Sequence, residues 1–384
     1  MKRLVAISIA ACSLTACEMS TLPPELDPSL TTQALAVPPS IVDLGTLGGA
    51  SSSAQGVNEA GQIVGFSSLS GEAAEHAVLW DNGGITDLGT LGGAFSHATA
   101  INEEGQVVGE SLLSGESNVQ HAFLWEAGTM TDLGTLGGAQ SAAYAINDVG
   151  QIVGVSTLAS GAQHAFLWED GTMRDLGTLG GTNSIALGIN NSGQVVGLSE
   201  MPGGGLGAAH AFLWQAGSMI DLGTIGGSFS VGAGINNAGE VVGGSTRIGD
   251  AIADAFLWRN GAMTTLVLAV AGSSGNGIND LSHIVGSYFP FGDFSEERAF
   301  LWEDDVSVDL GSLGGTKSVA YGINNAGKIV GQSTLDDALA AHAVVWTILT
   351  RASCDDGGWA ALGFRNHGQC IRYVTTGKDS RSGT

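Results

Sequence analysis

The chain has 384 residues, a formal net charge of −24, only 13% charged residues and 61 glycines. Between residues 17 and 346 it carries 34 acidic and 6 basic residues, a balance of −28, which excludes nucleic acid and anionic lipid as electrostatic partners. Such composition is typical of many short strands joined by tight turns.

Residues 1–17 have the pattern of an export signal. Two basic residues, Lys2 and Arg3, precede an apolar stretch over residues 4–14 that is too short to anchor the chain across a bilayer. The following Leu-Thr-Ala-Cys resembles the lipobox of bacterial lipoproteins, which predicts that Cys17 becomes the lipidated first residue. Glu18 then favours the outer membrane or cell surface. The alternative is an ordinary secretory signal in which Cys17 has no role.

Residues 18–39 predict a linker rather than a packed element. This nearly uncharged segment holds five of the seven prolines, a composition that gives a semi-extended spacer. It would hold the following domain away from a membrane surface.

A tryptophan then returns every 43 to 46 residues, which fixes the number of repeats at seven: Trp80, Trp125, Trp168, Trp214, Trp258, Trp302 and Trp346. Each copy contains versions of Asp-Leu-Gly-Thr-Leu-Gly-Gly, Ile-Asn, Gly-Gln-Val-Val-Gly and His-Ala-Phe-Leu-Trp. A unit of this length cannot bury its own apolar face, and its period is that of a four-stranded propeller blade.

The second copy shows the four expected strands. Residues 96–102, 105–111, 121–125 and 130–133 are short, alternating or β-branched, and are separated by Gly or Asn. We name them A to D from the central channel outward. Helical periodicity is absent outside the signal.

The first copy begins with an outer strand at residues 41–44, and the last copy ends after its third strand. We therefore expect an all-β fold over residues 40–347, a seven-bladed β-propeller of four-stranded antiparallel blades. The N-terminal strand would complete the last blade and so remove the exposed edges of an open array.

Length changes among the repeats fall almost entirely in the B–C loops. Counted from the serine that ends strand B to the first residue of strand C, these loops have 8, 9, 7, 10, 8, 10 and 8 residues, with Ser287 as the serine of the sixth copy. Variable loops on a constant scaffold are where binding differences usually lie.

The repeated histidines and aspartates predict structural roles. One histidine per blade cannot converge on one metal, so we expect it to hold strand C by hydrogen bonding. Each repeated Asp stands alone before Leu-Gly, without the clustered oxygens of a calcium loop, which favours turn capping over calcium. We expect no metal or other cofactor.

Residues that break the repeat are the candidates for function. The B–C loop of the sixth copy holds four aromatic residues, which predict a contact surface for a sugar or a protein; the alternative is a small satellite core beneath the loop. The candidate ligand contacts are Tyr288, Phe289, Phe291 and Phe294, with Arg247 and Asp250 in the fifth copy as lesser candidates.

The sequence shows no catalytic constellation. No serine lies in a nucleophile elbow, and no His–acid or carboxylate pair can be brought together without knowing the loops. His97 and His283 have no recurring partner in the sequence and are expected to have no specific role. A channel enzyme would need blade-specific polar residues that converge at the channel mouth.

The combined motif resembles the probable extracellular HAF repeat of bacteria, named for the His-Ala-Phe found at residues 121–123, 164–166 and 210–212. The resemblance covers residues 41–346 and implies an exported repeat protein, but it carries no binding residues. Residues 348–384 form a small tail whose segment 354–378 resembles a module of secreted bacterial proteins. Once Cys12 leaves with the signal and Cys17 takes lipid, Cys354 and Cys370 remain as a disulfide pair.

The sequence therefore predicts a lipid-anchored, monomeric binding module outside the cytoplasm. Its partner would be a protein or a glycan, recognised through the B–C loop face, and the membrane would be reached through the N-terminal lipid alone. The alternatives are a hydrolase or lyase at the central channel and a structural envelope or adhesion protein.

Overall fold

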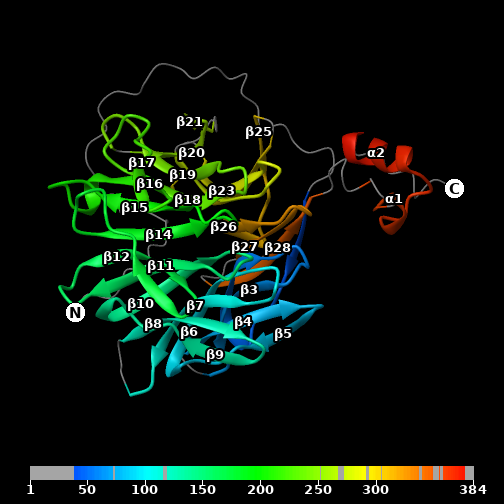
Figure 1. Ribbon diagram of the computed structural model, residues 1–384. Helices are drawn as coiled ribbons and strands as arrows, with labels where there is room; N and C mark the ends of the chain where they lie inside the picture. The colour runs from blue at the N-terminus through cyan, green and yellow to red at the C-terminus, as the bar shows by residue number, and fades with distance from the viewer. Residues whose placement is uncertain are drawn as a thin grey trace.

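The computed structural model describes residues 39–71, 74–115, 119–250, 252–266, 272–290, 294–303, 305–336, 340–348, 354 and 358–376. Cys17, Phe291 and nearly all of the predicted linker lie outside these residues. The described strands form seven four-stranded antiparallel blades arranged in a ring (Figure 1), so the predicted seven-bladed propeller is confirmed.

Each blade runs from strand A at the channel to strand D at the rim. Blade one consists of β2 (Gly48–Val57), β3 (Ile63–Leu69), β4 (Glu75–Asp81) and β5 (Gly84–Asp87). Blade two consists of β6 (Gly92–Ile101), β7 (Val107–Leu113), β8 (Gln120–Glu126) and β9 (Thr129–Asp132). Blade three consists of β10 (Gly137–Ile146), β11 (Ile152–Leu158), β12 (Gln163–Glu169) and β13 (Thr172–Asp175). Blades four and five are β14 (Ser184–Ile189), β15 (Val195–Glu200), β16 (Ala209–Gln215), β17 (Ser218–Asp221); β18 (Ser230–Ile235), β19 (Val241–Thr246), β20 (Ala253–Arg259), β21 (Ala262–Thr265), with a 3₁₀ turn at Leu206–Ala208. Blades six and seven are β22 (Gly272–Ile278), β23 (Ile284–Phe289), β24 (Arg298–Glu303), β25 (Val306–Asp309); β26 (Gly314–Ile323), β27 (Lys328–Leu335), β28 (Ala341–Thr347), β1 (Ser40–Asp43).

The N-terminal strand closes the ring, as predicted. β1 pairs antiparallel with β28, with Ile41 opposite Trp346 and Asp43 opposite Val344. The order of the last blade is therefore β26, β27, β28 and β1. Blades one and two are additionally joined by a single parallel bridge between Glu75 and Phe95, which makes them one eight-stranded sheet.

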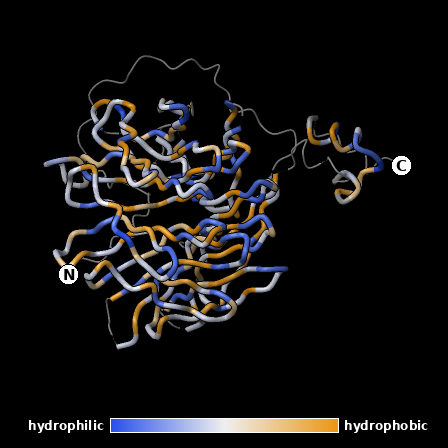
Figure 2. Tube along the Cα trace, viewed as in Figure 1, coloured by the Kyte–Doolittle hydropathy of each residue, from blue (hydrophilic) through white to orange (hydrophobic). Residues whose placement is uncertain are grey.

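Apolar side chains fill the gaps between neighbouring blades. Among the described residues, one buried cluster lies at each of the seven blade interfaces. The cluster between blades three and four, for example, contains Val153, Leu167, Phe212 and Trp214. Figure 2 shows the corresponding alternation of apolar strands and hydrophilic turns. Burial of this area between blades supplies the main driving force for the fold.

The repeated polar residues are partners of one another. In five blades the histidine of strand C contacts the aspartate of strand D through Nδ1 at 2.8–2.9 Å, and that aspartate accepts a hydrogen bond from the glycine amide two residues later. Both predicted structural roles are thus confirmed. In blade six Arg298 makes the contact to Asp309, and in blade five Asp254 pairs with Arg247 instead.

Two rings of hydrogen bonds encircle the end of the channel at the A–B turns. In the inner ring the buried Asn of each turn donates to the carbonyl of the next, at 3.0–3.2 Å, and Asn324 returns to Asn58. In the outer ring each following residue donates its backbone amide to the side chain of its neighbour, and Asn325 returns to Glu59. Both rings are closed, which independently confirms seven blades.

Two predicted details are corrected. Strand A of the four long blades begins at the Gly-Gly pair of the repeat, so β6 starts at Gly92 rather than residue 96. In blade six Tyr288, not Ser287, lies opposite the first residue of strand C, because β23 pairs Tyr288 with Arg298. Its B–C loop therefore has nine residues between these two positions.

The tail contains helices that the sequence analysis did not predict. α1 (Gly358–Ala361) and α2 (His367–Thr376) pack around the predicted disulfide of Cys354 and Cys370, which is present with a Cα–Cα distance of 5.7 Å. Phe364 is buried beside the two cysteines, with Trp359 and Tyr373 against them. Helical periodicity is weak in this segment because the helices are short and the disulfide contributes to the small core. None of the described helices is long and apolar enough to cross a membrane.

Candidate functional site

Every strand A carries a β-bulge at the same position. In β10, for example, Ala143 pairs with Gly154 and Ala145 with Val153, so that Tyr144 between them is unpaired. The same register shift occurs in all seven blades. A bulge redirects the side chain of its extra residue. These bulge residues line the channel: Gln55, Thr99, Tyr144, Leu187, Ala233, Asn276 and Tyr321.

The bulge residues differ from blade to blade, although the residues around them repeat. A second layer of the channel varies in the same way, because strand B of one blade faces strand A of the next. Phe66 meets His97 in this manner, and the strand position of Phe66 is taken by Glu110 in blade two and by Gln332 in blade seven. The scaffold therefore presents a different side chain from each blade into one shared space.

This space is a cavity of about 410 Å³ lined by 17 residues. Blades three to five contribute mainly apolar side chains, including Ile185, Leu187 and Ala233, which adjoin a buried cluster around Leu198 and Val231. Blades six, seven, one and two contribute amides, hydroxyls and carboxyls. The cavity is therefore amphipathic, and none of its lining residues is Lys or Arg.

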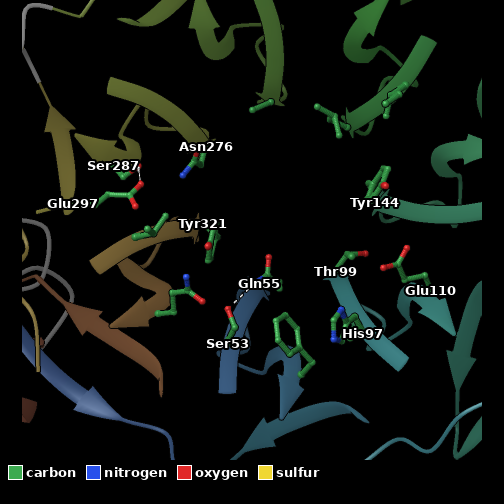
Figure 3. Close-up of a pocket in the computed structure, with 17 residues that line it drawn as sticks. Ser53, Gln55, His97, Thr99, Glu110, Tyr144, Asn276, Ser287, Glu297 and Tyr321 are labelled. Carbon is green, nitrogen blue, oxygen red and sulfur yellow. Dashed lines mark hydrogen bonds between the residues drawn. The ribbon is translucent and has the colours of Figure 1, made fainter. Parts of the chain in front are cut away.

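Glu110 is the most buried acid of the cavity. It lies on β7 and is 6% exposed, and burial raises its pKa to about 7. One carboxyl oxygen accepts a hydrogen bond of 2.6 Å from Gln120. Tyr144 stands beside it (Figure 3), and burial and the nearby carboxylate raise the pKa of that phenol. Glu110 is thus a carboxylic acid that can change protonation near neutral pH.

Glu297 lies on the opposite side of the cavity (Figure 3). It immediately precedes β24, is 9% exposed and accepts a hydrogen bond of 2.8 Å from Ser287, while burial raises its pKa. Because Glu297 ends the B–C loop of blade six, it places this part of the cavity at the B–C loop face. The opposite end is encircled by the asparagine ring.

His97 makes specific contacts, which corrects the expectation from the sequence that it has no role. Its ring stacks on Phe66 with centroids 3.8 Å apart, and Nε2 lies 3.0 Å from Oε2 of Glu75. Burial lowers the pKa of His97, opposed by Glu75, whose own pKa is lowered by the contact. His283 is likewise paired, at 3.1 Å from Glu303, on the A–B side.

The predicted aromatic contact surface is only partly exposed. Tyr288 donates a hydrogen bond of 3.0 Å to Asp309 and takes the place that serine holds in the other blades. Phe289 is half-buried and packs against Phe294 at 5.9 Å, whereas Phe294 is 58% exposed. These residues combine a satellite core with one exposed ring.

The lesser candidates are engaged within their own blade. Arg247 pairs with Asp254. Asp250 accepts hydrogen bonds from the Ser228 amide at 2.6 Å and from Thr246 Oγ1 at 2.7 Å, which lower its pKa. Both residues therefore stabilise the blade-five loop, and neither lines the channel cavity.

The sequence analysis missed the channel residues, although a signal for them was present. In the segment that leads into each Ile-Asn, the position of Tyr144 is occupied by a different residue in most copies. The positions around it are nearly constant, with Ser, Ala or Gly before it and Ile-Asn after it. The same holds for Glu110 in the segment Val-Val-Gly-Glu-Ser, where Glu replaces Phe, Val or Leu of other copies. Their convergence depends on the bulge, which the repeat pattern does not reveal.

No family model and no curated protein matches the sequence significantly. Among solved structures, the β-propeller domain of the trilobed protease from Pyrococcus furiosus matches with a TM-score of 0.53 at 9% identity, over 77% of this chain and 95% of that domain. That domain has an open velcro topology, whereas β1 closes the ring of this chain. At this identity the likeness shows the β-propeller fold alone.

Two further structures are similar at a lower level. Oligogalacturonate lyase from Vibrio parahaemolyticus matches with a TM-score of 0.49 at 9% identity, over 81% of this chain and 97% of that one. TolB from Acinetobacter baumannii matches with a TM-score of 0.41 at 13% identity, over 64% of this chain. The present chain spans 61% of that TolB.

Proposed function

We propose that this protein is an exported, lipid-anchored propeller of the HAF-repeat type that binds a short glycan in its central channel. The observation that carries the proposal is the ring of blade-specific side chains that the bulges direct into one cavity. The proposal moves the main recognition site from the B–C loops to the channel, with the loops around its entrance. The export signal and Cys17 would hold the protein at the outer membrane or cell surface.

The lining chemistry favours a sugar. Amphipathic pockets of a few hundred Å³ with a small number of convergent polar groups are typical small-ligand sites. The half-buried rings of Tyr144, Tyr321 and Phe66 offer apolar surfaces to sugar faces, while Gln55 and Asn276 offer amides to hydroxyls. The two carboxyl groups that line the cavity, with no lining Lys or Arg, disfavour an anionic ligand.

A channel-filling substitution tests the proposal. Ala233→Tyr places a phenol at a bulge position where blades three and seven already accommodate Tyr144 and Tyr321. We expect the detergent-solubilised full chain to bind short neutral or amine-bearing glycans on an array, and Ala233→Tyr to weaken binding at least about tenfold because it fills the cavity. Calorimetry with the best array ligand gives the affinity.

The matched control is the double variant Phe289→Ser/Phe294→Ser, which alters the loop surface and leaves the channel intact. Loss of binding in this variant, with full binding in Ala233→Tyr, would assign recognition to the loops instead. No binding of the wild-type chain to any glycan would reject the proposal.

A channel hydrolase is the second candidate, because Glu110 and Glu297 face one cavity from opposite sides and both carry raised pKa values. A carboxylic acid with a pKa near neutrality can act as a general acid. The same glycans are therefore assayed for new reducing ends. Cleavage that disappears in both Glu110→Gln and Glu297→Gln would identify an enzyme.

A further inference from the structure

The charge of the cavity is unbalanced. Two acids, Glu110 and Glu297, line it from different blades, and the lining His97 is held against Glu75 behind it. Lys317 acts electrostatically on Glu297 and is itself exposed, but it does not line the cavity. Ionisation of a buried carboxyl group that has no cationic partner destabilises the folded protein. The carboxyl groups of this cavity therefore lack the cation that would balance their charge.

Glu110 has an oxygen available to a ligand. Oε2 accepts the hydrogen bond from Gln120, and no described residue donates to Oε1. Within the described residues, the fully buried side-chain atoms that lack a hydrogen-bond partner are the indole nitrogens of Trp80 and Trp346. Oε1 of Glu110 also lacks a partner but is not one of these atoms, so it is not fully buried. It is therefore open to the cavity that Glu110 lines. A nearly buried carboxyl group therefore points one oxygen into the cavity.

An aromatic face accompanies this oxygen. Tyr144 stands beside Glu110 (Figure 3), and Phe66 and Tyr321 line the same cavity. A carboxylate together with aromatic rings is the combination that binds ammonium groups, through a charge-assisted hydrogen bond and cation–π attraction. The overall charge of −24 further concentrates cations near the molecule.

We propose that the channel ligand carries an ammonium group, as in an amino sugar with a free amine, and that Glu110 receives this group beside Tyr144. The inference deepens the proposed function and rests on it. The amine completes the pairing that the protein lacks, and the sugar hydroxyls and ring faces meet the remaining polar and apolar surfaces.

Such binding is coupled to proton release. Glu110 must ionise to pair with the ammonium, and at pH 6 it is mostly protonated, so binding releases about one proton. The other titratable groups near Glu110 are His97, its cross-strand partner on β6, and Tyr144 on β10, while Gln120 beside it is neutral. His97 gains positive charge at low pH and would then repel the ammonium group. This effect weakens binding at low pH just as protonation of Glu110 does, so the two contributions must be measured separately.

Calorimetry of the full chain with chitosan trisaccharide, which has free amines, and with its fully N-acetylated counterpart tests the inference. We expect the free amine form to bind at least about tenfold more tightly at pH 6.5. Titration in buffers of different ionisation enthalpy should show release of nearly one proton at pH 5.5, where Glu110 is protonated and the ligand amine is still mainly charged. Affinity should rise several-fold from pH 5.5 to pH 6.5, because deprotonation of the amine offsets part of the gain from ionisation of Glu110.

Three variants separate the causes. Glu110→Gln should remove the preference for the free amine and the proton release. His97→Gln alters a lining residue, so its overall affinity is not compared with that of wild type, but the ratio between the two trisaccharides and the proton release should both remain. Glu104→Gln makes the same charge change at an exposed A–B turn and should behave as wild type. Thermal unfolding shows whether each variant is folded before it is titrated.

The outcomes distinguish this inference from the proposed function. Equal binding of both trisaccharides, unaffected by Glu110→Gln, would overturn the ammonium site and leave a glycan-binding channel. Binding of neither trisaccharide, with other glycans bound on the array, would also overturn it. Failure of every glycan would reject both proposals.

Discussion

At the scale of single residues, Glu110 shows how one substitution within a repeated frame changes the chemistry of a cavity. Its equivalents include Phe66, Val155 and Leu198, which pack against the next blade. A carboxyl group placed there is buried by the same neighbours, and its only protein partner among the described residues is the Gln120 amide. Desolvation therefore acts without an opposing cation, which raises the pKa of Glu110 to about 7.

This burial predicts a specific dependence of stability on pH. Below the ordinary pKa of 4.5, Glu110 is protonated in both the folded and the unfolded chain. As the pH rises, the unfolded chain ionises first, so the free energy of unfolding falls until the folded pKa near 7 is passed. Relative to Glu110→Gln, the wild type should lose on the order of 2–3 kcal/mol between pH 5 and pH 8.

Urea unfolding at several pH values, with Glu104→Gln as the control, measures this difference. Using the variant for comparison cancels the contributions of Glu297 and His97, which titrate in both proteins. A constant difference between wild type and Glu110→Gln across this range would show that the folded carboxyl group is ionised.

At the scale of elements, the A–B turns join neighbouring blades. Asn190 donates from Nδ2 to Gln194 Oε1 at 2.7 Å and to the Asn236 carbonyl at 3.0 Å, while its Oδ1 accepts from the Ser192 and Gln194 amides. It is 3% exposed. An amide is needed at this position, since aspartate offers no donor to the facing carbonyl. The recurring Asn is therefore both a hairpin residue and an interblade bond.

Asn190→Ala should lower the free energy of unfolding by about 2–4 kcal/mol, because it leaves several buried groups without partners. Its neighbour Asn191 belongs to the exposed outer ring and bonds Asp148 at 2.6 Å, so Asn191→Ala should cost less than about 1 kcal/mol. Chemical denaturation of both variants gives the comparison. Equal losses would contradict the importance assigned to the buried ring.

The repeat pattern was sufficient to predict blades, strand order and ring closure, because each depends on period, turn residues and apolar alternation. The structural roles of the repeated histidine and aspartate follow from their recurrence, but their pairing with each other was not predicted. The channel site could not be predicted in this way. Tyr144 reaches the channel because a bulge shifts the register of β10, and Glu110 meets it only through the packing of adjacent blades. The tail helices were missed because short helices around a disulfide lack a long periodic face.

At the scale of the whole molecule, closure couples blades that are distant in sequence. An open repeat array has terminal units that contact one neighbour each. In this ring Ile41 of β1 packs on the cluster between blades six and seven that contains Trp346 and Ile348, and Asn324 of blade seven bonds to Asn58 of blade one. The last blade is therefore incomplete until the first segment of the chain has been added to it.

Ile41→Asn should consequently destabilise the entire ring. We expect a loss of about 2 kcal/mol, because a partly buried apolar side chain leaves the cluster between blades six and seven. Val42→Asn is the matched control in the same strand, since Val42 is 53% exposed and should cost less than about 0.5 kcal/mol. If blades unfold together, hydrogen exchange should show equal loss of protection in β28 and in β15 of blade four, on the far side of the ring. Loss of protection confined to β28, with β15 unchanged, would show instead that the closing strand stabilises its own blade alone.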